Sequence, residues 1–575
     1  MTSLRKSSNP LHTDHFDIYF YPEEKAAAQQ AARMAERWYS RHKFILQHEL
    51  NGRQAILLYA SHPQFEQTNA LGGGDIGEGT GGVTEALQRR IVLPFAGPIA
   101  ETDHVIGHEL VHAFQYDLTG VNTGGRFRSP AGLQLPLWFI EGMAEFLSLG
   151  SNDPNTAMWM RDAVKTQKKL PNLRDLEGGR FFPSRYGQAL LSYIAGRWGD
   201  GAIGELLKEF GGPGRTASLD GAIRKVLHVG PDTLAQDWHE ALRAAYAPLM
   251  KTTEAPEKYG KLLISKKTGA GDLNVGPVLS PDGKNVIFFS EKDLFSIDLF
   301  LADAKTGKIK HNLVRAEKDP HLESLEFINS AGAWEAGGAR LAFALVTKGR
   351  PGLALLEVKN HKITREIRLP HLGEIFNPTW SPDGKSIYFI SDRDGISNIY
   401  RLELASANLF QVTNLYTGVS GITASSPALS VAQKINCLSF SVYENGKYNI
   451  YTTDTPEVLA GKPVAEFSDG VSSATLPPVV RVSTNLDSVL HNSTMGLSNA
   501  AHHRIVEYKP KLALTYIGQP VLAGGYDSYG VHLGGGISLM WSDKLGNRNL
   551  SLAAQAQIDG AERAQSCYCW PGVGI

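Results

Sequence analysis

Five consecutive residues, His108-Glu109-Leu110-Val111-His112, have the types and spacing of a zinc-binding motif. On a helix the two histidines lie one turn apart on the same face, and neutral imidazole is a preferred zinc ligand. Glu109 follows the first histidine, so its carboxylate can face a zinc-bound water as general base. The pattern indicates a hydrolytic zinc site. The alternative is a solvated helix face that carries two histidines by chance.

Two acids, Glu141 and Glu145, lie four residues apart within 135–150. A catalytic zinc needs a third protein ligand and an open position for water, and Glu141 can be that ligand. Glu145, one turn further on, can accept the remaining ring N–H of a ligand histidine and so fix its tautomer. The two segments together predict a His₂Glu site with Zn²⁺ as cofactor. The alternative is two surface acids on an amphipathic helix.

The residues around these motifs show the periodicity of helices. Apolar residues recur at helical spacing in 23–42, 103–118 and 135–150, and 89–95 reads as a short strand. We therefore expect residues 12–250 to form an α-rich α+β domain that positions the metal ligands.

The segments GHELVHAFQ and LPLWFIEGMAEF resemble the gluzincin clan, in particular the bacterial peptidase MA-like zinc metallopeptidases with a zincin-like fold. The resemblance covers residues 12–250. It implies zinc ligands and a catalytic base and acid at the matching positions, which are His108, His112 and Glu141 for the metal and Glu109 for catalysis. The spacing to Glu141 is longer than in the best-known aminopeptidase members, so aminopeptidase specificity is not carried over.

Other positions match the clan in part. Tyr186, in SRYGQALLSYIAGRWG, matches a tyrosine whose hydroxyl would stabilise the oxyanion, or it is a packing residue at a helix start. Strand 89–95 corresponds to the substrate-binding edge strand of these folds. Glu85 lies where some relatives grip a substrate amine, although a solvated loop acid is the simpler interpretation. His104, one turn before the motif, reads as structural or exposed.

After residue 255 the helical period gives way to short β-rich runs. Four of them align at steps of roughly 50 residues, which predicts propeller blades rather than a β-sandwich. The aligned runs are 278–290, 333–345, 379–391 and 428–441. Pro-Asp-Gly turns at 281–283 and 382–384 should link two strands of a blade at equivalent positions.

The segment 391–414 resembles the repeat of TolB-type, six-bladed-like β-propellers. We assign 255–505 to this all-β propeller, with 460–505 contributing to a fifth blade. No G-x-S-x-G elbow occurs in the chain, which disfavours a propeller-capped serine peptidase. The propeller is therefore expected to bind or gate, or to act as a rigid spacer.

The last region, 506–575, has a third residue pattern, different from both the helical and the repeat regions. KLALTYIG, GVHLGGGISLMWSD and RNLSLAAQAQIDG alternate apolar with small or polar residues, and they resemble the start of an outer-membrane β-barrel. We predict a short, barrel-like and truncated β-strand tail in which AERAQSCYCWPGVGI breaks the alternation. The full chain should then express poorly, and a chain ending near 505 should be soluble.

Composition excludes several classes of protein. Lys+Arg 57 against Asp+Glu 58 gives a net charge of −1, so no basic surface for nucleic acid is expected. Three cysteines rule out a disulfide scaffold and a cysteine-built zinc site. No apolar run is long enough for a transmembrane helix. The Gly-rich stretch 72–82 lacks the P-loop pattern and reads as a flexible loop near the cleft.

The function predicted from these features is that of a zinc metallopeptidase acting on peptide or protein substrates, with the propeller binding substrate or partners. The alternative is a non-catalytic envelope protein-interaction or assembly factor that uses the propeller. Domain content indicates the periplasm or outer membrane of a bacterium, with envelope protein partners and outer-membrane association through the C-terminal strands. The N-terminus lacks the apolar core of a signal peptide, so we expect the natural chain to start further upstream.

Overall fold

A computed structural model describes residues 9–574, with gaps. The gaps are 69, 72–75, 78, 96–98, 121–134, 168–169, 212–217, 293–296, 315–332, 337–338, 348–349, 358–361, 369–373, 424–425, 465–472, 483–484, 493, 500–501, 519–520, 528–529 and 560–562.

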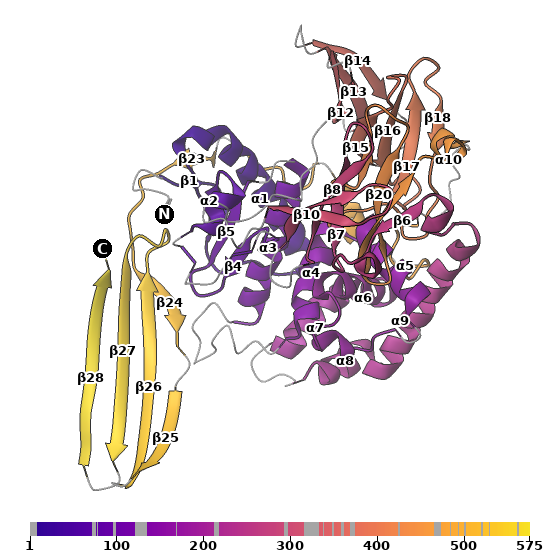
Figure 1. Cartoon of the computed structure of the whole chain (residues 1–575). Coiled ribbons are helices and arrows are strands. Elements are labelled where there is room, and N and C mark those ends of the chain that lie inside the picture. The colour runs from indigo at the N-terminus through magenta and orange to yellow at the C-terminus, as the bar shows by residue number, and fades with distance from the viewer. Residues whose placement is uncertain are drawn as a thin grey trace. The chain divides into compact units, whose positions relative to one another are not determined.

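The chain divides into two compact units, and neither is continuous in sequence. The first comprises Met1–Gly150, Phe182–Pro231 and Val482–Ile575, and the second comprises Ser151–Phe181 and Asp232–Arg481. The predicted domains, 12–250, 255–505 and 506–575, remain a prediction, because compact packing units need not coincide with functional modules. The protein is multidomain, with a helix-rich N-terminal part followed by a propeller-like β region (Figure 1).

The first unit contains a six-stranded mixed sheet in the order β23-β1-β2-β3-β5-β4. Its strands are β1 (Leu11–His12), β2 (Phe16–Tyr19), β3 (Gln54–Tyr59), β4 (Val83–Glu85), β5 (Arg90–Pro94) and β23 (Arg504–Ile505). Strands β2, β3 and β5 are parallel, and every residue of β3 and β5 is buried, as expected of interior parallel strands. The prediction that 89–95 is an edge strand is wrong. β5 pairs with β3 on one side and with antiparallel β4 on the other, so β4 is the edge.

The described helices of the first unit are α1 (Lys25–Leu46), α2 (His62–Glu66), α3 (Ile99–Leu118), α4 (Leu137–Leu149), α6 (Pro183–Trp198), α7 (Gly201–Gly211), α8 (Leu219–Leu227) and α11 (Leu486–His491). Helices α1, α2 and α3 pack against its six-stranded sheet, and the remaining helices pack against other helices. Helices α1, α3 and α4 occupy the three segments with predicted helical periodicity. Apolar residues at helical spacing on α3, Ile106, Leu110 and Phe114, are fully buried. Helix α3 packs against both α1 and α4, and this fixes the face that carries the motif.

Helices α4 and α6 cross in backbone contact at Gly142 and Gly187. A Cβ atom on Gly187 would lie 1.9 Å from the carbonyl oxygen of Trp138, which is backbone and cannot move away alone. We therefore expect Gly187→Ala to force the helices apart and to lower the free energy of unfolding by about 3 kcal/mol. Urea unfolding measures this, with Gly201→Ala as control, because nothing lies within 4 Å of a Cβ there. Equal unfolding midpoints for the two variants would contradict the close crossing.

Within its described residues, the second unit contains four antiparallel sheets. The first sheet has β7 (Asn274–Leu279), β8 (Asn285–Ser290), β9 (Asp298–Asp303) and β10 (Ile309–Val314), and the second has β11 (Ala333–Trp334), β12 (Arg340–Thr347), β13 (Arg350–Glu357) and β14 (Lys362–Arg368). The third sheet has β15 (Ile375–Trp380), β16 (Ser386–Ser391), β17 (Asn398–Glu403), β18 (Leu409–Gln411) and β22 (Lys462–Pro463). The fourth sheet has β19 (Leu429–Val431), β20 (Leu438–Glu444), β21 (Lys447–Thr453) and β6 (Lys261–Ile264). The four aligned sequence runs each supply the first two strands of one sheet, which confirms the blade repeat.

The two Pro-Asp-Gly turns occupy equivalent places, as predicted. They join β7 to β8 and β15 to β16, and the last residue of each, Gly283 and Gly384, has a φ of +66° that favours glycine. In both turns the aspartate accepts hydrogen bonds from a serine hydroxyl two residues earlier and from the backbone N–H two residues later. The aspartate side chain therefore fixes the hairpin geometry of both blades.

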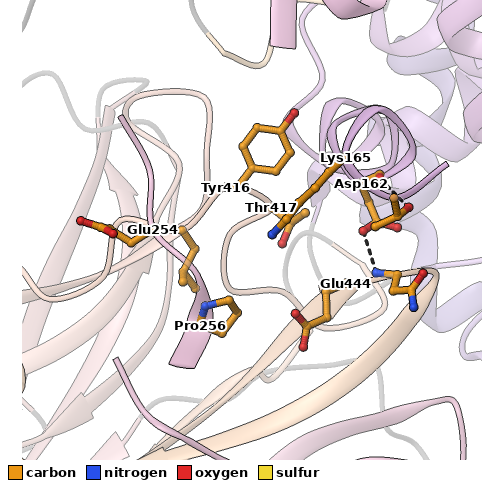
Figure 2. A pocket seen from close by; sticks show the side chains of 10 residues that line it. Asp162, Lys165, Glu254, Pro256, Tyr416, Thr417 and Glu444 are labelled. Atoms are coloured by element: carbon orange, nitrogen blue, oxygen red, sulfur yellow. Dashed lines mark hydrogen bonds between the residues drawn. The ribbon is translucent and has the colours of Figure 1, made fainter. Parts of the chain in front are cut away.

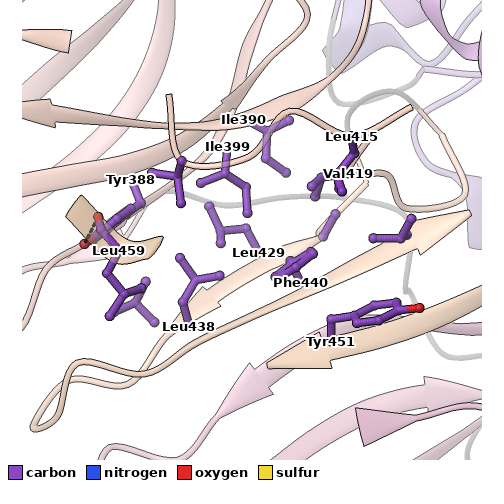
Figure 3. Close-up of a cluster of buried hydrophobic side chains, with 14 residues drawn as sticks. Tyr388, Ile390, Ile399, Leu415, Val419, Leu429, Leu438, Phe440, Tyr451 and Leu459 are labelled. Atoms are coloured by element: carbon purple, nitrogen blue, oxygen red, sulfur yellow. Dashed lines mark hydrogen bonds between the residues drawn. The ribbon is translucent and has the colours of Figure 1, made fainter. Parts of the chain in front are cut away.

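Buried apolar clusters lie between neighbouring sheets. Strand β7 packs on β20, β15 on β19, and β12 on β15. Figure 3 shows the cluster shared by the third and fourth sheets, where Ile390 and Ile399 face Leu438 and Phe440. The interpretation of 460–505 as part of a fifth blade is wrong for the described residues. Strand β22 extends the third sheet, and β23 joins the sheet of the first unit.

Helix α5 (Pro154–Thr166) belongs to the second unit and is fastened to its loops by two adjacent side chains. Arg161 is fully buried and donates to the backbone carbonyls of Tyr416 at 2.8 Å and Ser473 at 2.9 Å. Asp162 accepts from the backbone N–H groups of Asn445 and Gly446, the tip of the β20–β21 hairpin (Figure 2). Helix α9 (Pro231–Tyr246) contributes Tyr246, whose hydroxyl donates to Thr475.

The C-terminal residues form one antiparallel sheet in the first unit. Its strands are β24 (Ala513–Ile517), β25 (Val521–Asp527), β26 (Gly530–Ser542), β27 (Asn549–Asp559) and β28 (Arg563–Gly574), with β24 and β25 both on one side of β26. The sequence predicted three of these strands and missed β25. The strand β28, in the stretch where the alternation breaks, was not predicted either. In the described part of the chain, no helix has the length and apolar character needed to span a membrane.

Candidate metal centre

Helices α3 and α4 bring three metal-binding side chains together. His108 Nε2 lies 3.3 Å from Glu141 Oε2, and His112 Nε2 lies 3.8 Å from the same oxygen. One donor atom from each residue falls within 4.8 Å of the others. The i, i+4 spacing sets the two histidines on one face of α3, and the packing of α4 on α3 supplies the acid.

The electrostatics of the three donors suit a cation. Burial opposes a charge on His108, but the hydrogen bond to Glu141 and the nearby acids outweigh it and raise the pKa of His108 to about 9. Burial likewise opposes the charge of Glu141, yet its pKa is lowered by His108 and His112. A positive charge is therefore favoured at this point, and two imidazoles with one carboxylate form a donor set that zinc prefers. The residues present fit a zinc ion.

Glu109 is held on the side of α3 that faces the edge strand. The Thr84 hydroxyl, on β4, lies 2.6 Å from Glu109 Oε2 and 2.9 Å from its backbone carbonyl. Gly82 allows this approach, since a Cβ there would lie 2.8 Å from Glu109 Cγ. Thr84 was not singled out from the sequence, because no motif relates an edge-strand threonine to an acid on a distant helix.

Gln115 orients His112, and the sequence reading also missed it. Its Oε1 lies 2.9 Å from His112 Nδ1, and its Nε2 donates at 2.9 Å to the carbonyl of Ile140, the residue before Glu141. The amide is fully buried. With Nδ1–H donated to Gln115, Nε2 is the free imidazole nitrogen that faces Glu141. One side chain thus links the histidine helix to the helix of the third donor.

Substituting Gln115 should weaken the binding of zinc. We expect Gln115→Ala to lower zinc affinity by roughly 10–100-fold, because His112 loses its orienting acceptor and α3 loses a bond to α4. Gln115→Glu keeps the acceptor but removes the donor to Ile140, so it separates the two contributions. Competition with a chromophoric chelator measures the affinity, with exposed Gln30→Ala as control. Wild-type affinity in Gln115→Ala would show that the bond is not needed.

Glu145 lies beside His108, although farther than a hydrogen bond. Its Oε1 is 3.9 Å from His108 Nδ1, so the expected bond of 2.6–3.2 Å is not formed. Its other oxygen lies 3.7 Å from His104 and 4.0 Å from Arg185. Burial opposes its charge, but Arg185, His104 and His108 together lower its pKa. His104 therefore helps to keep the Glu145 carboxylate charged beside the metal centre.

Three further residues belong to the surroundings of the site, two that the sequence predicted and one that it did not. Tyr186 is buried near the start of α6, and its role as an oxyanion donor stays a prediction. Glu85 is neither a loop acid nor free, because it ends β4 and pairs with Arg90. Tyr116, one turn after His112, was not predicted. Burial and the charges of Glu109, Glu141 and Glu85 raise its pKa to about 12. The proposed loop at 72–82 lies partly outside the described residues.

The second unit has a polar cavity of its own. It measures about 340 Å³ and is lined by α5 together with loops of the third and fourth sheets (Figure 2). Its acids are largely engaged. Asp162 holds the hairpin tip, Glu254 pairs with Lys258, and Glu444 accepts from Tyr451. The three acids that line this cavity are therefore all engaged by neighbouring residues of the second unit.

Comparison with known proteins supports the propeller. A family model described as a TolB beta propeller domain matches residues 303–459. No curated protein matches the chain. Solved structures with low overall similarity include TolB from Agrobacterium tumefaciens, at 17% identity over 32% of this chain and 61% of that one (TM-score 0.18). TolB from Acinetobacter baumannii shows 14% identity over 59% and 72% (TM-score 0.19). A puromycin-hydrolyzing peptidase of Mycobacterium tuberculosis shows 15% identity over 51% and 44% (TM-score 0.19).

These superpositions are too loose to inform function, and the chain spans 61% of the Agrobacterium protein. The fold assignment rests on the family match together with the repeated sheets. Residues 303–459 carry a TolB-type β-propeller domain.

Proposed function

We propose that the first unit is a zinc-dependent metallopeptidase of the gluzincin type. The observation that carries the proposal is the convergence of His108, His112 and Glu141, with Glu109 fixed beside them by Thr84. A merely structural zinc site would have no use for an acid held in this position. His108, His112 and Glu141 would hold Zn²⁺, which when bound would polarise a carbonyl and lower the pKa of water toward neutrality.

Glu109 carries the proton transfers of the proposed reaction. Its carboxylate takes a proton from the attacking water while the water oxygen bonds to the carbonyl carbon of the scissile peptide. The same carboxyl group then returns the proton to the leaving amine as the C–N bond breaks, so the group is regenerated. Thr84 keeps the carboxylate in one orientation, which reduces the reorganisation needed during the reaction. The Tyr186 hydroxyl is the candidate for binding the carbonyl oxygen.

Strand β4 is suited to bind the substrate. Among the described residues it pairs with β5 alone, so its other edge offers backbone N–H and C=O groups to an extended peptide. Thr84 lies in this strand and touches Glu109, so a peptide added to β4 passes the general base. The proposed substrate is therefore an extended peptide or an unfolded protein segment.

The propeller is proposed to recruit protein partners or substrates in the bacterial envelope, in the periplasm or at the outer membrane. The TolB-type match at 303–459 supports this role. The same match favours the second candidate function, a non-catalytic interaction or assembly factor. The two differ in whether the metal centre turns over peptides.

Metal removal and restoration test the proposal. The purified full chain is analysed for metal, treated with a chelator, and supplied with Zn²⁺ or Mg²⁺ before digestion of a peptide library. We expect one zinc per chain, loss of cleavage after chelation and recovery with zinc alone. Zinc-free protein with unchanged cleavage would refute the metallopeptidase, and zinc-loaded protein without cleavage of any peptide would favour the interaction factor.

A further inference from the structure

Arg90, at the start of β5, is a fully buried cation whose partners come from three places in the chain. Its Nε donates to Glu85 of β4 and one terminal nitrogen donates to the carbonyl of Ala70. The other terminal nitrogen donates to the carbonyls of Lys544 at 2.8 Å and Asp543 at 3.3 Å. A buried guanidinium requires such partners, because a charge away from water is costly unless it is paired and hydrogen-bonded.

Asp543 and Lys544 open the turn between β26 and β27, residues 543–548, which we name the C-terminal turn. Asp543 organises it by accepting from the backbone N–H of Asn547 at 2.7 Å and from the Tyr508 hydroxyl at 3.0 Å. Leu545, only 1% exposed, is buried in the apolar cluster that packs on β2, β3 and β5 of the six-stranded sheet. The turn is therefore a built part of the first unit's core.

Gln88, in the short connection between β4 and β5, adds a second attachment. Its side-chain amide donates to the carbonyls of Ala513 and Ser542, each at 3.0 Å, and to the Thr515 hydroxyl at 2.8 Å. Lys544 in turn donates to the carbonyl of Gln88. The β4–β5 hairpin is thus held from outside by residues more than 400 positions later in the sequence.

The same hairpin holds the general base. Glu85, paired with Arg90, directly follows Thr84, whose hydroxyl contacts the Glu109 carboxylate. We propose that Arg90 is a positioning residue that ties strand β4, and through Thr84 the Glu109 carboxylate, to the C-terminal turn. The catalytic arrangement then requires the C-terminal turn, residues 543–548, to stay packed against the six-stranded sheet. This inference rests on the proposed peptidase function for its activity readout, but not for its structural readout.

The attachment of the C-terminal turn bears on the expectation that a chain ending near 505 should be soluble. A chain ending near 505 lacks the Lys544 and Asp543 carbonyls, so Arg90 would be left with unpaired N–H groups inside the sheet. It also lacks Leu545, so part of the apolar cluster would meet water. The C-terminal strands are therefore not a separable tail with respect to the metal centre.

The test uses the full chain with Leu545→Ala and Glu85→Gln, and with Leu550→Ala as the matched control. Leu550 lies on β27, just after the C-terminal turn, but it is 36% exposed. Its truncation to alanine should therefore leave the packing of the turn intact. Hydrogen exchange of the backbone amides of 83–92, zinc content and peptide cleavage are measured together. We expect at least tenfold faster exchange in β4 and at least tenfold lower kcat in both test variants, with zinc content unchanged. Leu545→Met, which conserves the side-chain volume, should keep both the exchange rate in β4 and kcat close to the wild-type values.

Unchanged exchange in β4 for both test variants would overturn the proposal. A fall in cleavage that only parallels loss of zinc would also overturn it, because the turn would then support the fold and not Glu109. If wild-type protein cleaves no peptide, the metallopeptidase function fails separately, and the coupling of the turn to β4 is still decided by hydrogen exchange and its rescue in Leu545→Met.

Discussion

Glu109→Gln is expected to reduce peptide cleavage by about 10³-fold or more while the protein keeps its zinc. General acid–base catalysis contributes typically 10²–10⁴-fold, and Glu109 would serve in both proton transfers. Glutamine has nearly the same shape and can still accept the Thr84 hydroxyl, so the local structure should persist. Cleavage of a fluorogenic peptide identified from the library, with zinc measured in the same samples, gives the result.

Glu101→Gln is the matched control for this substitution, because it makes the same chemical change in the first turn of the same helix. It should retain cleavage within a factor of two or three. If Glu109→Gln cleaves as fast as wild type, Glu109 is not the base, and the observed activity comes from another site or a contaminant. Loss of zinc in Glu109→Gln would instead assign the residue to metal binding.

Glu141→Gln is expected to weaken zinc binding on the order of 100-fold or more. The proposed site has three protein ligands, so the loss of the carboxylate removes one of three protein–metal bonds and the only negatively charged one. Cleavage at limiting zinc should fall accordingly and recover partly when zinc is added in excess. Chelator competition measures the affinity, and a zinc titration of cleavage measures the recovery.

Glu145→Ala distinguishes the two acids of α4. Its carboxylate is 3.9 Å from His108 and acts through that histidine, so we expect a loss of about 10-fold, clearly smaller than that of Glu141→Gln. The reverse order would mean that Glu145 is the ligand, and that the cluster of His104, His108 and Glu145 holds the metal. If neither substitution changes the zinc affinity, neither cluster is a zinc site.

The sequence was sufficient for features that one helix or one repeat determines. The i, i+4 spacing of His108 and His112 fixes their common face wherever the helix packs. Glu141 and Glu145 could be paired with them because both acids lie in a second segment with clear helical period. The blades were visible for the same reason, since each carries the same strand–turn–strand pattern with its own turn chemistry.

Features that depend on packing between distant segments could not be read in this way. Gln115 looks like any helical glutamine until α4 supplies the Ile140 carbonyl. Strand β4 was missed as the edge because it has three residues and a connection without Asn-Gly or Pro-Gly, in which Arg89 has a positive φ of 47°. Arg90 reads as a charged residue in a strand, and its burial depends on carbonyls more than 450 residues away.

The pairing of β6 with β21 determines how the second unit responds to tension along the chain. The strands are antiparallel, and Lys261, where the chain enters the sheet, lies opposite Thr452, close to where β21 ends. A pull on the chain before β6 and after β21 therefore acts on the same end of the pair. The hydrogen bonds open one after another, as in a zipper, and do not share the load as they would in shear. A pull applied at these two points should therefore separate β6 from β21 progressively, starting at Lys261 and ending at Ile264.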